Sequence, residues 1–156
     1  MSPFRLLGID PRPFQSLFAL DDRELAGHGA MRVFADADSG YPCRVSLEDA
    51  RVGEELLLLP YVHQPEATPY RASGPIFVRR GACRPTLAAG LVPAYVSTRL
   101  ISLRAYDAAH MMVDAEVREG GEVSAWLDTA FQHERVAYVQ LHNARRGCFS
   151  CTAVRA

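Results

Sequence analysis

The sequence predicts a single α+β domain, built on a mixed and largely antiparallel β-sheet with two or three helices. The chain has 156 residues, the size of one ordinary domain, and we expect that domain to span residues 1–156. Most of its apolar runs are short and are separated by turn residues, as is typical of strands. One later segment shows the helical period instead.

We expect a short helix in the N-terminal part of the chain. Asp21 is followed three residues later by Glu24, which is the pattern of a capping box, and the helix is expected to end at Gly27 or Gly29. The next run, Met31–Phe34, has strand character and is expected to form the first strand.

The middle of the chain predicts two more strands. Ser46–Ala50 is typical of one capped turn, and Gly53 then admits a strand over Glu55–Leu59. This strand contains four consecutive leucines, which indicates burial on both faces and a central place in the sheet. Another short strand is expected over Ile76–Val78.

The C-terminal half predicts a hairpin, a helix and two further strands. Thr98–Tyr106 and Met111–Arg118 are strand-like runs joined by a four-residue loop. The apolar residues of an amphipathic helix follow at helical spacing: Val123, Trp126, Leu127, Ala130 and Phe131. Val136–His142 is the next strand, and the strand–helix–strand order favours a right-handed crossover onto the same sheet. We expect Phe149–Arg155 to add a last strand at the edge.

Composition excludes several classes of function. All 17 basic residues are arginine, so no lysine is available for Schiff-base, pyridoxal phosphate, P-loop or kinase-type chemistry. Domains that bind nucleic acid present a strongly basic face, whereas this chain has a net charge of −1 and scattered arginines. We therefore expect no nucleic-acid partner.

No segment indicates a membrane span or an export signal. The longest apolar candidates, Leu56–Leu59 and Leu91–Val96, fall short of the roughly 18–20 residues that span a bilayer. The segment Met1–Arg5 lacks the apolar core and cleavage site of a secretory signal. We expect a cytoplasmic protein with no membrane partner, whose four cysteines are reduced thiols.

Two cysteines and two histidines are the candidates for catalysis: Cys43, His63, His142 and Cys148. They lie in or beside loops rich in proline, glycine and arginine, where functional sites usually form. A thiolate is activated by a neighbouring imidazole or arginine, and histidine exchanges protons near neutral pH. The alternative is that the cysteines are small buried hydrophobic residues, as free cysteines usually are.

Alternation along the strand that ends at His142 constrains its geometry. Val139 and Leu141 share one face, which we expect to meet the core. Tyr138, Gln140 and His142 share the other face, which we expect to line a wet surface or a cleft.

No metal is assigned. The Cys/His set offers acceptable ligands but lacks the short spacings of a zinc knuckle, so a metal-assisted hydrolase is the lesser alternative. Cys148 and Cys151 form a C-x-x-C in a strand-like segment, without the helix that a thiol–disulfide catalyst needs. The residues name no cofactor.

Arginines are the second group of candidate site residues, because the guanidinium group binds carboxylate or phosphate through two parallel hydrogen bonds. Arg71, Arg104 and Arg145 are the candidates to hold an anionic ligand, together with Tyr70 and Asn143 beside them. The alternative is that these arginines are ordinary surface residues in ion pairs.

The ordered motifs of this chain resemble one family. They are Cys43–Leu47, Asp49–Ala50, Gly53–Glu54, Leu57–Leu59, Tyr61, His63–Gln64, Pro69–Val78, Ser102–Asp107, Met112–Ala115 and His142–Cys148. Together they are similar to the domain of unknown function 1203 family, whose members are cytosolic bacterial proteins of this length. The resemblance covers nearly the whole chain, leaves Cys151 outside its motifs, and implies kinship without an activity, substrate or cofactor.

The first functional hypothesis is a pocket that binds or acts on an anionic small molecule through arginine, histidine and cysteine side chains. The second is a non-catalytic interaction module, a homodimer that pairs through the exposed edge of the strand over Phe149–Val154.

Overall fold

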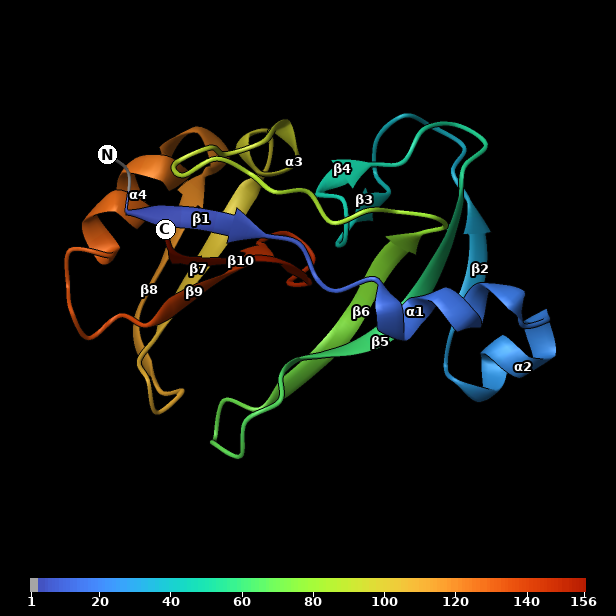
Figure 1. Ribbon diagram of the computed structural model, residues 1–156, viewed down its shortest axis with the longest axis horizontal. Coiled ribbons are helices and arrows are strands. Elements are labelled where there is room, and N and C mark those ends of the chain that lie inside the picture. The colour runs from blue at the N-terminus through green and yellow to red at the C-terminus, as the bar shows by residue number, and fades with distance from the viewer. Residues whose placement is uncertain (1–2) are drawn as a thin grey trace.

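The computed structural model describes residues 3–156. Within them, ten strands form two five-stranded sheets (Figure 1). Four short α-helices and two 3₁₀ turns complete the described residues, so the predicted α+β class is confirmed, with two sheets in place of one. Met1 and Ser2, which begin the segment expected to lack an export signal, lie outside the described residues. Among residues 3–156, no helix has the length and apolar character needed to cross a membrane.

Sheet A is antiparallel throughout and contains both terminal strands (Figure 1). Its order is β1 (Phe4–Leu7), β10 (Phe149–Arg155), β9 (Tyr138–Asn143), β7 (Leu100–Tyr106) and β8 (Met112–Glu119). Apolar side chains on one face pack against α3 (Ala94–Ser97) and α4 (Val123–Ala130), which follows the 3₁₀ turn η2 (Gly120–Glu122).

Sheet B is formed by the segment between β1 and the rest of sheet A. Its order is β2 (Met31–Phe34), β5 (Glu55–Gln64), β6 (Ala72–Arg79), β3 (Pro42–Cys43) and β4 (Glu48–Asp49), with β3 and β6 parallel. One face carries its own core under the helical segment α1 (Arg12–Gln15), η1 (Ser16–Ala19) and α2 (Asp22–Gly27).

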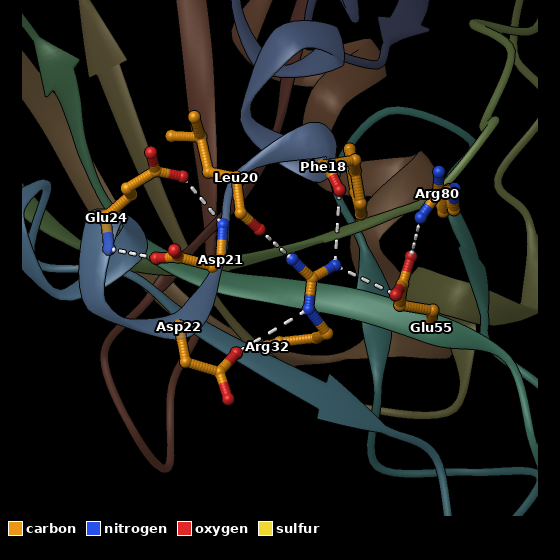
Figure 2. Close-up of polar contacts among 8 residues, drawn as sticks. All are labelled: Phe18, Leu20, Asp21, Asp22, Glu24, Arg32, Glu55 and Arg80. Atoms are coloured by element: carbon orange, nitrogen blue, oxygen red, sulfur yellow. Dashed lines mark hydrogen bonds and ion pairs between the residues drawn. The ribbon is translucent and has the colours of Figure 1, made fainter.

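The predicted capping box is present at the start of α2. The Glu24 N–H donates to Asp21 Oδ1 over 2.8 Å, and the Asp21 N–H donates to Glu24 Oε2 over 2.9 Å (Figure 2). The helix ends at Gly27, as expected. The strand over Met31–Phe34 is also confirmed, although β1 precedes it.

The strand with four leucines lies inside sheet B, between β2 and β6, as its composition predicted. Leu57 and Leu59 face the core of this sheet, whereas Leu58 points to the other face and is half-buried. Leu58 on this second face of sheet B contributes to the lining of the pocket described below.

The predicted hairpin and amphipathic helix are confirmed as β7–β8 and α4, and the chain crosses through α4 from β8 to β9 in the same sheet. The expectation that Phe149–Arg155 forms an edge is wrong. β1 covers that side of β10, with Phe4 opposite Arg155 and Leu7 opposite Thr152. The edge expected to pair two copies of the chain is therefore already paired within one chain.

Candidate functional site

A pocket of about 570 Å³ opens between the two sheets. Sheet B contributes apolar side chains to its wall: Leu58, Pro75 and Phe77. Sheet A contributes the start of β7 and the reversal of the chain between β9 and β10. The pocket therefore combines an apolar wall with a polar turn.

The turn between β9 and β10 carries most of the polar wall. Gly147 adopts a φ of 78°, a conformation that glycine accepts without strain, and its N–H donates to the carbonyl oxygen of Asn143 over 2.7 Å. The Asn143 N–H in turn donates to the carbonyl oxygen of Cys148 over 2.9 Å. This closed loop holds Arg145 and Arg146, both exposed, and the half-buried Cys148 at the pocket.

Arg44 is the innermost charged residue of the pocket wall. Only 2% of the residue is exposed. Its Nε donates to the carbonyl oxygen of Phe149 over 2.7 Å, and its Nη1 to that of Pro42 over 2.6 Å. Within residues 3–156, no carboxylate lies within ion-pair distance of this guanidinium. Burying a charge without an opposite charge costs several kcal/mol in principle, so the neighbourhood of Arg44 favours an anion.

The remaining charges of the lining are mostly positive. Arg99 is held by both carboxylate oxygens of Asp49, at 2.7 and 2.9 Å, so its charge is matched within the chain. Arg145 and Arg146 make no ion pair with any described residue, and Glu119 is the acidic residue of the lining. The pocket therefore offers an electropositive environment.

The side-chain oxygen of Asn143 adds an acceptor that the protein leaves unused. Oδ1 is buried and has no hydrogen-bond donor among the described residues. A buried acceptor without a donor costs about 1–3 kcal/mol, so this atom too favours a bound partner.

A half-buried arginine, Arg32, shows how the same fold matches a positive charge with carboxylates of its own chain. Its Nη1 donates to Glu55 Oε1 over 2.9 Å, and its Nε lies 3.7 Å from Asp22 Oδ1 (Figure 2). The carbonyl oxygens of Phe18 and Leu20 accept the remaining hydrogen bonds. Figure 2 shows these partners surrounding the guanidinium on several sides.

A histidine cluster, defined here as His63, Gln140 and His142, lies on the polar face of β9. Gln140 and His142 are buried, whereas His63 comes from β5 and is half-buried. His63 Nδ1 lies 3.0 Å from Gln140 Oε1, and Gln140 Nε2 donates to the carbonyl oxygen of His63 over 2.8 Å. The rings of His63 and His142 meet edge to face, with centroids 4.7 Å apart. The cluster therefore ties the end of β5 to β9 and links the two sheets.

His142 also contacts the turn between β9 and β10, because its Nδ1 lies 3.1 Å from the carbonyl oxygen of Gly147. Burial, together with the positive charge of Arg104, lowers the pKa of His142 to about 3. Burial also lowers the pKa of His63. Both imidazoles are therefore neutral at physiological pH.

The four candidates for catalysis do not converge at one point. His63 and His142 touch each other, and Cys148 lies in the pocket wall. Cys43 is completely buried in the core of sheet B, where its Sγ accepts the N–H of Arg79 over 3.2 Å. No group of three or more potential metal ligands comes together anywhere in residues 3–156.

The expected face assignment on β9 is confirmed for the core side, since Val139 and Leu141 are fully buried there. The expectation that the opposite face lines a wet surface or a cleft is wrong for Gln140 and His142. Sheet B covers them, so they are only 3% and 0% exposed, and neither lines the pocket.

The candidate ligand residues separate into two groups. Asn143 and Arg145 line the pocket, as their role requires. Arg104 lies instead on the polar face of sheet A, opposite Gln140, and its Nε donates to Ser102 Oγ over 3.3 Å. Tyr70 packs edge to face on Tyr106 near that face, and neither Tyr70 nor the exposed Arg71 belongs to the pocket lining.

Sequence reasoning missed Arg44, and it chose Arg145 without its neighbour Arg146. The signal for Arg44 was its position inside an otherwise apolar run, Pro42–Val45, but arginine is rarely fully buried, so the run alone did not predict its place. All four cysteines are free, and burial raises the pKa of Cys151 to about 12, so the C-x-x-C segment lacks an activated second thiol.

Comparison with known proteins gives one match. Residues 40–155 match the model of the family described as "Protein of unknown function (DUF1203)". No curated protein matches the chain, and no solved structure does.

Proposed function

The chain belongs to the DUF1203 family of proteins of unknown function, and we propose that it binds a small anion, carrying a carboxylate or phosphate group, in the pocket between its two sheets. The observation that carries this proposal is Arg44. It is a fully buried guanidinium in the pocket wall that has two carbonyl partners and no carboxylate.

The other polar residues of the lining have supporting roles in this proposal. Arg145 and Arg146 attract the anion to the pocket entrance, where solvent and salt weaken their effect. Asn143 accepts a hydrogen bond from the ligand, and Cys148 contacts it. His63 and His142 position the turn that carries these groups. We further propose a cytoplasmic location, which suits a chain whose four cysteines are all free.

The test is calorimetric titration of the protein with inorganic phosphate, lactate, 3-phenylpropanoate and 3-phenyllactate at fixed ionic strength. We expect at least one of these anions to bind with a dissociation constant in the millimolar range or tighter. The double variant Arg145→Gln/Arg146→Gln should weaken that binding about fivefold or more, because two positive charges are lost from the entrance.

Two single variants serve as controls. Arg51→Gln removes an exposed arginine outside the lining and should leave the affinity unchanged. Arg71→Gln separates the pocket from the sequence-based ligand set, because Arg71 is equally exposed and lies outside the lining. Equal losses in all three variants would show non-specific attraction to surface charge and would refute the proposed site, as would no binding of any anion.

A further inference from the structure

We infer that the ligand is a carboxylic acid with an apolar body and a hydrogen-bond donor, and that the apolar body lies against the exposed face of sheet B. This inference rests on the proposed function, since it specifies the chemical class of ligand for the same pocket. Three independent features of the lining support it: its apolar wall, the number of unmatched charges inside it, and the free acceptor of Asn143.

The apolar wall comes from the second face of sheet B. Leu58 and Phe77 are directly opposite each other on β5 and β6, so their side chains lie on the same face. Pro75 lies two residues before Phe77 and shares that face. These residues point away from the core formed by Leu57 and Ile76, and no helix covers them in the pocket.

The wall is also held in place. The Phe77 ring packs against Tyr41 with centroids 5.6 Å apart, and the Tyr41 hydroxyl donates to Asp36 Oδ1 over 2.7 Å. A fixed apolar surface inside a pocket of about 570 Å³ suits a small molecule with a ring or a short chain. A purely polar anion such as inorganic phosphate leaves this surface in contact with water.

The one unmatched positive charge deep in the pocket calls for a ligand with one negative charge. Asp49 already neutralises Arg99, so Arg44 is the unmatched cation among the buried and half-buried residues of the lining. Arg145 and Arg146 are exposed, and Glu119 offsets part of their charge. A carboxylate, with one charge and two oxygens arranged for a guanidinium, satisfies Arg44 without leaving a second charge buried.

The unused side-chain acceptor of Asn143 indicates that the ligand carries a hydrogen-bond donor. Its main-chain N–H and carbonyl are both used within the turn, by Cys148 and Gly147, so the side-chain oxygen is its free acceptor. A hydroxyl or amide N–H on the ligand would satisfy this oxygen. An acid without such a donor leaves it buried and unpaired.

The experiment compares four probes on the wild-type protein by calorimetry. 3-Phenyllactate has the carboxylate, the apolar ring and a hydroxyl donor. 3-Phenylpropanoate lacks the donor, lactate lacks the ring, and phosphate lacks both the carboxylate and the ring. We expect 3-phenyllactate to bind at least tenfold more tightly than lactate, and at least threefold more tightly than 3-phenylpropanoate.

Two variants assign these differences to the residues named. Leu58→Asn should remove most of the advantage of 3-phenyllactate over lactate, because the apolar wall is interrupted. Val62→Asn is the matched control, since Val62 lies on the same strand, is 46% exposed and is outside the lining. Asn143→Ala should remove the difference between 3-phenyllactate and 3-phenylpropanoate.

The outcomes separate the ligand class from the proposed function. If phosphate or lactate binds as tightly as 3-phenyllactate, and the arginine variants weaken that binding, the ligand class is overturned and the anion pocket stands. If none of the four probes binds, the proposed function itself fails. If Val62→Asn removes the ring preference as well as Leu58→Asn does, the assignment of the apolar wall is overturned.

Discussion

Arg32 is half-buried and Arg44 is fully buried, and the partners of the two guanidinium groups differ. Arg32 is surrounded by two carboxylates and two carbonyl oxygens from its own chain (Figure 2). Arg44 is more deeply buried, and among the described residues its guanidinium donates to two carbonyl oxygens and to no carboxylate. Because a buried charge requires compensation, the comparison separates an arginine whose charge the fold itself matches from one whose charge is left for the proposed ligand.

The largest effect is expected for Arg32→Met. This change leaves Glu55 with Arg80 alone and removes the donors to the carbonyl oxygens of Phe18 and Leu20. Chemical denaturation should show a loss of about 3 kcal/mol in the free energy of unfolding, because two carbonyl oxygens lose their donor and Glu55 loses one of its two arginine partners. The affinity for 3-phenyllactate should stay within twofold of wild type; a loss of binding would contradict the separation of roles.

Arg44→Met should have the opposite profile. Affinity for 3-phenyllactate should fall at least a hundredfold, which is about 2.7 kcal/mol, because the carboxylate loses its buried partner. Stability without ligand should fall less than in Arg32→Met, because the loss of two hydrogen bonds to carbonyl oxygens is offset by removal of an unmatched buried charge. Binding that survives this change would place the anion elsewhere.

A change of pH should also distinguish the two regions. The pKa of His142 is lowered to about 3 by burial, then by Arg104, with Arg44 among the further causes. As the pH falls below about 6.5, the unfolded chain takes up a proton that the folded chain excludes, so stability is lost. The ion pair of Arg32 with Glu55 persists over this range, because hydrogen bonds from Arg80 and Arg32 lower the pKa of Glu55.

Between pH 7 and pH 5.5 we expect His142 to account for a loss of about 1 kcal/mol in the free energy of unfolding. His63 contributes in the same direction, because its pKa is also lowered. Urea denaturation of wild type and His142→Gln at the two pH values measures the difference. An equal pH dependence in both proteins would contradict the assignment.

The smallest expected effect concerns Glu119, the acidic residue of the pocket lining. Glu119→Gln should raise the affinity for 3-phenyllactate two- to threefold, about 0.5 kcal/mol, because an exposed like charge is removed from the entrance. Glu116→Gln is the matched control on the same strand, since Glu116 pairs with Arg118 outside the lining. Affinity should be unchanged there.

Local signals in the sequence predicted the local elements of this fold. The capping box at Asp21, the hairpin between β7 and β8, and the periodicity of α4 depend on neighbouring residues, and each is confirmed. β1 was missed because its partner, β10, lies at the other end of the chain. The full length of β5 was hidden by Pro60, because proline lacks the N–H that a strand donates to its neighbour. In the structure Pro60 lies opposite Pro75, and the pairing continues to Tyr61 and Gly74.

The site was predictable where it is contiguous and unpredictable where it is assembled. Asn143, Arg145 and Cys148 belong to one turn, and the sequence identified all three. Arg44 and the apolar wall come from sheet B, and their meeting with that turn depends on how two sheets pack, which residue types do not reveal. Whether two copies of the chain associate stays a prediction, since the proposed edge is covered by β1.

The pairing of β1 with β10 has a consequence for how the protein forms. Phe4 lies opposite Arg155, so sheet A cannot be completed until the last strand has been synthesised, whereas every strand of sheet B lies within residues 31–79. Contacts this distant in sequence are slow to form, and sheet B is therefore expected to be in place first during translation. The pocket has one wall from each sheet, so the proposed anion site is expected to be complete only after both sheets have formed.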